Sequence, residues 1–271
     1  MGQTLQIRDK IFSDKENKKY QERTGMKEVG TRVYRQELKF LCEERQLRVI
    51  EDRIRHICRP DAHGGNKGIY TVRSLYFDTY DDKCYQENLA GVDRRKKYRI
   101  RAYNEDTDRL RLECKSSCHG RKSKEGCPVD RELCRKLAAG QGRWGVFPEG
   151  RLEQGREIPG AVGLLERFLL ERRLELLEPR VVVEYDRTPY VYPVGNVRIT
   201  FDRSIRTSHQ VFAFPEKSRV RRLILPEGVN VLEVKYDEVL PGAVRELLTA
   251  GQELRRTSFS KYALCRQYGF R

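Results

Sequence analysis

The chain has 271 residues, enough for one large domain or two small ones, and its hydrophobic fraction of 38% is adequate for one core. Its 55 Lys and Arg residues outnumber its 40 Asp and Glu residues, which gives a formal charge of +15 and favours a polyanionic partner such as nucleic acid, anionic lipid or polyphosphate. A basic surface that only aids solubility would have the same composition, so charge alone does not identify the partner.

Two further classes of protein are disfavoured. The eight cysteines are spread from 42 to 265, in a chain far longer than most disulfide-stapled modules. Residues 1–30 are charged and lack the apolar segment of a secretory signal, so we expect reduced thiols in a cytoplasmic protein. The set Cys114, Cys118, His119 and Cys127 lacks a Cys-x-x-Cys knuckle, which argues against zinc. Charges interrupt the most apolar segment, 162–178, which therefore predicts an amphipathic helix instead of a membrane span.

The chain is expected to consist of a charged, poorly ordered lead-in over residues 1–30 and a single domain over 31–271. Alternating patterns predict strands over 32–40, 69–79, 94–104, 109–117, 120–126, 179–192, 195–205 and 229–238, with shorter strands over 209–214 and 220–225. Helical spacing predicts a helix that ends at Pro60, a helical turn within 80–91, and helices over 128–139, 160–177, 241–250 and 258–267. A Gly-rich loop is expected over 141–157.

Five of the predicted strands carry charges on one face and apolar side chains on the other. In "KYRIRAY", Lys97, Arg99 and Arg101 point to one face, because successive side chains of a strand alternate between faces. The other four charged sets are Arg35, Glu37 and Lys39; Arg111, Glu113 and Lys115; Arg198, Thr200 and Asp202; and Glu233 and Lys235.

A sheet of such strands can lie flat with its charged face in water, or it can close into a barrel with a charged interior. Closure is favoured because helices flank the strands, because the excess of cations would repel itself without a bound anion, and because closure removes edge strands. We therefore predict an α+β fold: a closed antiparallel β-barrel with a charged interior and helices packed on the outside. Cations that hold phosphate oxygens, together with carboxylates that hold a divalent metal, suit a polyphosphate ligand.

Seven segments occur in the order seen in a known family: "YRQELKF", "SLYFDTYDDKCYQE", "KYRIRAY", "RLECK", "VRITFD", "VLEVKY" and "SFSKY". In this respect residues 31–268 resemble the catalytic domain of the vacuolar transporter chaperone (VTC) family. That resemblance implies a polyphosphate polymerase of the triphosphate tunnel metalloenzyme superfamily, with ATP and inorganic polyphosphate as partners and Mn²⁺ or Mg²⁺ as cofactor.

The resemblance also implies which residues form the site. The catalytic cations would be Lys39, Arg99, Arg101, Lys115, Lys124, Arg187, Arg198 and Lys261, although Lys122 shares its face with Lys124 and the register there is open. Further substrate contacts would come from Glu37, Lys97, Lys235 and Ser260. Glu233 would be the metal-binding carboxylate. Any one of these side chains taken singly would be read as solvated or ion-paired, but their shared face favours a common role.

One departure separates this chain from the hydrolase and cyclase members of the superfamily. Those members begin with Glu-x-Glu-x-Lys, whereas this chain reads Arg35-x-Glu37-x-Lys39. Fewer carboxylates give weaker support for a second metal and an activated water, which favours phosphoryl transfer to a phosphate acceptor.

Two alternatives remain open from the sequence. One is a tripolyphosphatase or nucleoside triphosphatase of the same fold, and the other is a non-catalytic protein that binds polyphosphate. Nucleic acid is disfavoured because the aromatic residues do not interleave with the basic ones as stacking platforms. The chain is not expected to insert into a membrane, so a product that crosses one would need another polypeptide, such as a membrane-protein partner, to provide the path.

Overall fold

The computed structural model describes residues 36–62, 64, 68–104, 106–119, 121–140, 163–214, 216, 221–251 and 253–268. The chain divides into two units, Met1–Tyr34 and Arg35–Arg271. The lead-in expected over residues 1–30, the residue Arg35 and the loop expected over 141–157 lie outside the described residues.

One antiparallel sheet organises the second unit. Eight strands follow one another in the order β1-β10-β8-β7-β3-β4-β5-β6, and two short strands, β2 and β9, pair with β7 and β8. Their bounds are β1 (Gln36–Glu43), β2 (Arg59–Pro60), β3 (Tyr70–Asp78), β4 (Arg95–Tyr103), β5 (Asp106–Cys118), β6 (Arg121–Val129), β7 (Glu178–Tyr192), β8 (Val197–Ser208), β9 (Arg222–Leu223) and β10 (Val229–Tyr236). The long predicted strands are thereby confirmed.

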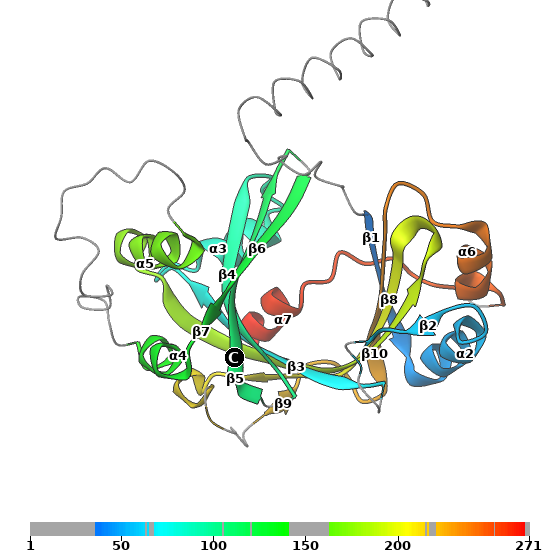
Figure 1. Ribbon diagram of the computed structural model, residues 1–271, viewed down its shortest axis with the longest axis horizontal. Coiled ribbons are helices and arrows are strands. Elements are labelled where there is room, and N and C mark those ends of the chain that lie inside the picture. The colour runs from blue at the N-terminus through cyan, green and yellow to red at the C-terminus, as the bar shows by residue number, and fades with distance from the viewer. Residues whose placement is uncertain are drawn as a thin grey trace, which may run out of the picture. The chain divides into compact units, whose positions relative to one another are not determined.

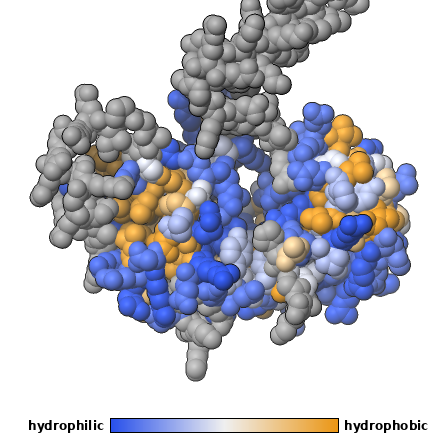
Figure 2. Space-filling view, in the orientation of Figure 1, coloured by the Kyte–Doolittle hydropathy of each residue, from blue (hydrophilic) through white to orange (hydrophobic). Residues whose placement is uncertain are grey.

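The sheet is strongly curved, with β4–β6 on one side of the concave face and β1, β8 and β10 on the other (Figure 1). Register shifts occur between β3 and β7, between β4 and β5, and between β7 and β8. Such bulges bend a strand and increase its local twist, which accounts for the curvature. Figure 2 shows a hollow between the two sides, with hydrophilic residues on the walls that are visible.

The prediction of a closed barrel is not confirmed, because the pairing of the described strands ends at β1 on one side and at β6 on the other. Closure by hydrogen bonds would bring these strands to about 4.8 Å. A side-chain ion pair spans them instead, with Lys122 Nζ 3.6 Å from Glu37 Oε2. Both edges carry inward lysines, Lys39 on β1 and Lys122 and Lys124 on β6.

Helices cover the convex face, where the apolar side chains of the strands point. Helices α4 (Arg131–Ala138) and α5 (Leu164–Leu174) share a core with the apolar faces of β4 and β5, including Ile100 and Leu112. Helices α2 (Glu44–Ile54) and α6 (Gly242–Thr249) pack on β8 and β10 in the same way, around Ile199 and Val234. This part of the prediction, with helices outside the sheet, is confirmed.

The last helix, α7 (Lys261–Gln267), is an exception, because it lies on the concave side (Figure 1). It begins at Ser260, whose hydroxyl accepts a hydrogen bond from the Ala263 amide at 3.3 Å. Its Tyr262 and Cys265 share a core with inward residues such as Val72 and Val183. Helix α3 (Lys83–Leu89) contributes Cys84 and Tyr85 to the same core. The concave face is therefore apolar beneath α7 and charged elsewhere.

Some predicted boundaries are wrong. The segment 209–214 contains a 3-10 turn, Val211–Ala213, instead of a strand, and Val194–Asn196 forms another. Pro128 belongs to β6, and α4 begins three residues later, at Arg131, because the Asp130 carboxylate accepts a hydrogen bond from Leu133 N at 2.7 Å. All eight cysteines are free, as expected for reduced thiols, and Cys114 lies in the apolar core. No helix in the described part of the chain is long and apolar enough to cross a membrane.

Candidate active site

The charged faces of the strands all point into the hollow. The strand registers place Glu37 opposite Lys235, Lys39 opposite Glu233, and Arg99 opposite Glu113. The same registers set Lys235 opposite Arg198, Arg187 opposite Asp202, and Lys115 opposite Lys124. The alternation read from the sequence is therefore confirmed, and it gathers side chains that are distant along the chain.

Glu113 organises the wall formed by β4, β5 and β6. Its Oε2 lies 2.6 Å from Arg99 Nη2 and 3.7 Å from Arg101 Nη1, and its Oε1 lies 2.5 Å from Lys124 Nζ. Arg99 also donates to the Tyr76 hydroxyl at 2.9 Å, and Arg101 donates to Ser74 Oγ at 3.3 Å. Burial alone would raise the pKa of Glu113, but Arg99 and Arg101 bring it to about 2. We call these four charged residues the Glu113 cluster.

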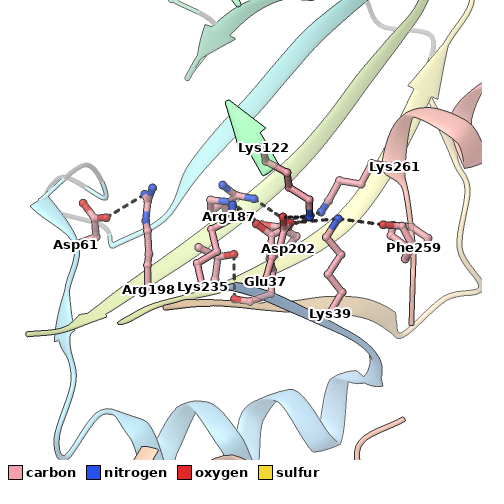
Figure 3. A network of polar contacts seen from close by, with 12 residues as sticks. Glu37, Lys39, Asp61, Lys122, Arg187, Arg198, Asp202, Lys235, Phe259 and Lys261 are labelled. Carbon is pink, nitrogen blue, oxygen red and sulfur yellow. Dashed lines mark hydrogen bonds and ion pairs between the residues drawn. The ribbon is translucent and has the colours of Figure 1, made fainter. Parts of the chain in front are cut away.

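A second cluster, centred on Asp202, joins β7, β8, β10 and α7 (Figure 3). Arg187 donates to both oxygens of Asp202, at 2.7 and 2.8 Å. Lys261 Nζ lies 2.7 Å from Asp202 Oδ2 and 3.9 Å from Glu233 Oε2. Lys235 also pairs with Glu233. These five residues form the Asp202 cluster.

The electrostatics of the Asp202 cluster favour the charged forms of Glu233, Asp202 and Lys261. Burial would raise the pKa of Glu233, but Lys235 and Lys261 hold it well below its ordinary value. Likewise burial would raise the pKa of Asp202, but Arg187 and Lys261 lower it. Burial would lower the pKa of Lys261, but Asp202 and Glu233 raise it.

Glu37 and Lys39 extend the site toward the edge of the sheet. Lys39 Nζ lies 3.2 Å from Glu37 and donates to the Phe259 carbonyl at 3.1 Å, just before α7. Burial and Glu233 would raise the pKa of Glu37, but Lys39 and Lys235 lower it overall.

Two predicted site residues differ in their partners from the rest. Arg198 lies apart from the Asp202 cluster, with Asp61 Oδ2 at 2.9 Å and the Tyr70 hydroxyl at 3.2 Å (Figure 3). Ser260 caps α7, so its hydroxyl is engaged by the backbone of its own helix.

Lysines form a row across the β4–β6 wall. Lys97 lies opposite Lys115, which lies opposite Lys124. Like charges directly opposite one another destabilise a sheet. Burial lowers the pKa of Lys97 to about 8, and Arg99, burial and Lys235 together hold the pKa of Lys115 well below its ordinary value. A bound anion would relieve this repulsion.

The carboxylates give limited support for a divalent metal. Among the described residues no three His, Cys, Asp or Glu side chains gather as a metal site. Glu233 and Glu37 provide hard oxygen ligands on one wall, in facing strands next to Lys39 and Lys235. Mg²⁺ is commonly held by one or two carboxylates plus substrate phosphates and water. The residues therefore fit a metal that arrives with a phosphate substrate.

Reasoning from the sequence missed several partners in the site. Glu113 and Asp202 were recognised on the charged faces but not as the centres of the two clusters. Tyr76, Asp78 and Tyr262 were not singled out at all. The alternation identifies the face of each residue, whereas its partners depend on strand register and on where α7 packs.

A curved antiparallel sheet with a charged concave face and helices on its convex face defines a class of β-proteins that enclose a polar path. Within this class, the VTC domain matches residues 34–270. The chain therefore belongs to the VTC domain family, as its seven motifs predict. No curated protein sequence matches it.

Two solved structures are reported for comparison, and HpAC1 is the one whose similarity bears on the fold. HpAC1 from Hippeastrum, a proposed adenylyl cyclase with a dominant triphosphatase activity, is similar with a TM-score of 0.50 and 15% identity over 86% of this chain and 96% of its own. The PH1819 protein of Pyrococcus horikoshii OT3 is similar with a TM-score of 0.42 and 15% identity, over 87% of this chain and 99% of its own. The likeness to HpAC1 is consistent with the triphosphate tunnel fold.

The lowered pKa values in the lysine row predict that anion binding takes up protons. A polyphosphate beside Lys97 and Lys115 favours their charged forms, so their pKa values rise on binding and affinity falls as the pH rises through about 8. Calorimetric titration with inorganic tripolyphosphate at pH 8, in buffers of different ionisation enthalpy, measures this uptake. We expect the wild type to take up more protons than Lys97→Met, because ionisation of the ligand contributes equally to both values. Equal proton exchange in the two proteins would contradict the assignment of Lys97 to the anion.

Proposed function

We propose that the protein is an ATP-dependent polyphosphate polymerase, which transfers the γ-phosphate of ATP to the end of a growing inorganic polyphosphate chain. Membership of the VTC domain family and the cationic concave face support a polyphosphate substrate. The substrate-contacting cations proposed are Lys39, Lys97, Arg99, Arg101, Lys115, Lys124, Arg187, Arg198, Lys235 and Lys261.

The ion pairing and the low pKa values of the carboxylates favour a polymerase over a hydrolase. Glu37, Glu113, Asp202 and Glu233 are each paired to a cation, and each has a lowered pKa. A carboxylate of low pKa that is already engaged by cations is a poor general base for activating water. The terminal phosphate of a polyphosphate chain is largely ionised near neutral pH and needs no base. The site therefore suits a phosphate acceptor better than water.

In the proposed reaction, an ionised terminal oxygen of the acceptor chain attacks the γ-phosphorus of ATP in line. The bond from that phosphorus to the β-phosphate oxygen breaks, and ADP leaves with the electron pair on its β-phosphate. Arg99, Arg101 and Arg187 are buried and preorganised, so they can stabilise the developing charge without rearranging. Lys261 orients the acceptor. No protein nucleophile is required.

Glu233, with Glu37 beside it, is the proposed ligand of Mn²⁺ or Mg²⁺. Such an ion, when bound, supplies charge neutralisation between neighbouring phosphate oxygens. The protein residues bind the remaining oxygens, and Lys235 and Lys39 keep the two carboxylates ionised.

Activity is tested by incubating the protein with ATP, Mn²⁺ and a short polyphosphate primer, and resolving the products by length on a gel. We expect a growing ladder with accumulating ADP. Lys115→Met should lower turnover roughly a hundredfold, corresponding to about 2–4 kcal/mol of lost transition-state stabilisation. Lys96→Met is the matched control, because Lys96 points to the convex face one strand away and pairs with Glu171.

Phosphate release without a ladder would favour the triphosphatase, and binding without turnover under either metal would favour a polyphosphate-binding protein. Equal turnover in Lys115→Met and Lys96→Met would contradict the assignment of the concave face.

Chain-length preference gives a second test. From Arg101 to Arg95 the β4 strand rises roughly 20 Å, which exceeds the length of a triphosphate. Arg95 lies opposite Ser117, which lies opposite Lys122, so this row continues the cationic face past Lys115. We expect Arg95→Met to weaken binding of long polyphosphate several-fold and to leave tripolyphosphate affinity unchanged, because Arg95 lies at the far end of this row. Calorimetry with both ligands measures this, and an equal loss for both would argue against a path for a longer chain.

A further inference from the structure

The carboxylate of Asp78 is fully buried at the end of β3, outside both charged clusters. Its Oδ1 accepts hydrogen bonds from the amides of Thr79 at 2.8 Å and Cys84 at 2.7 Å. Its Oδ2 accepts from the Tyr85 amide at 3.0 Å and from the Tyr262 hydroxyl. A buried carboxylate is costly unless it is fully hydrogen-bonded, and here both oxygens are engaged.

These bonds join three elements. Asp78 ends β3, the two helical amides belong to the first turn of α3, and Tyr262 is the second residue of α7. A second link runs parallel to the first, because Arg266 of α7 donates to both oxygens of Asp82 at 2.8 and 3.0 Å. Helix α7 is therefore fixed to α3 through polar bonds at both of its ends.

The residue before Tyr262 is Lys261, which bridges Asp202 and Glu233. The ring of Tyr262 also lies beneath a second lysine, with Lys97 Nζ 4.9 Å from the ring centre. Tyr262 is thus next in sequence to Lys261 of the Asp202 cluster, and its ring contacts Lys97 of the lysine row. A phenylalanine at 262 would fill the same core space, so the hydroxyl adds orientation beyond packing.

We infer that Asp78 and Tyr262 are positioning residues, which hold α7 so that Lys261 and Lys97 meet the phosphate chain. Neither side chain needs to touch substrate for this role. The inference rests on the proposed function only where it concerns phosphate, because the attachment of α7 can be measured without any ligand. It also gives a role to two sequence segments, "FDT" and "FSKY", that are 184 residues apart at their contact.

The test uses Tyr262→Phe, which removes only the hydroxyl. Tyr190→Phe is the matched control, because the Tyr190 hydroxyl is likewise buried and donates to a carboxylate, Glu51 Oε1 at 3.0 Å, next to the convex-face core. Hydrogen exchange of the α7 amides should be faster in Tyr262→Phe and unchanged in Tyr190→Phe. Unchanged α7 exchange in Tyr262→Phe would overturn the inference whatever the protein binds.

Binding of inorganic tripolyphosphate separates positioning from general stability. We expect Tyr262→Phe to weaken binding about tenfold, Lys261→Met to weaken it further, and the double variant to bind no more weakly than Lys261→Met alone. If the losses of binding free energy in the two single variants add in the double variant, Tyr262 does not act through Lys261. That result would overturn the inference that Tyr262 positions Lys261. If the wild type does not bind tripolyphosphate while α7 exchange responds as expected, the proposed function fails and the attachment of α7 stands.

Discussion

Repulsion among the cations on one face of the sheet is the constraint on which the rest of the structure depends. Strand alternation places all of them in the same hollow, and only a few carboxylates accompany them. Glu113 and Asp202 offset part of that repulsion by pairing with cations from neighbouring strands, and Asp202 also pairs with Lys261 of α7. Lys97 and Lys115 lie opposite each other on neighbouring strands, and burial lowers the pKa of Lys97 while Arg99 and burial lower the pKa of Lys115. The proposed phosphate ligand would balance this charge.

The unpaired edges of β1 and β6 and the packing of α7 on the concave face accompany this excess of positive charge. The described strands do not pair β1 with β6, and an ion pair between Glu37 and Lys122 spans the seam. Helix α7 covers the apolar part of the concave face and carries Lys261 into the charged part. The proposed phosphate path is thereby bounded by two charged walls and a helix. Because these carboxylates are paired with cations, we propose that the hollow transfers a phosphoryl group between phosphates instead of activating water.

Much of this could be predicted from the sequence, because the signals involved are local. Alternation in "KYRIRAY" and "RLECK" fixes which side chains share a face, and the structure keeps that assignment for Arg99 and Glu113. The register of β6 was open between Lys122 and Lys124, and both point inward, opposite Ser117 and Lys115. Closure could not be predicted in this way, since it depends on how two strands distant in sequence approach. The resemblance implies that Lys261 of the last helix reaches the site, but the apolar packing of α7 on the concave face could not be predicted, because a seven-residue helix with apolar and charged residues can pack on either face.

The central claim is that the concave face binds a phosphate chain, and a crystal structure with tripolyphosphate and Mn²⁺ tests it most directly. The account predicts phosphate oxygens within hydrogen-bonding distance of Arg99, Arg101 and Lys115, and an anomalous manganese peak beside Glu233. Tripolyphosphate bound only on the convex face, or manganese coordinated away from Glu233, would contradict it.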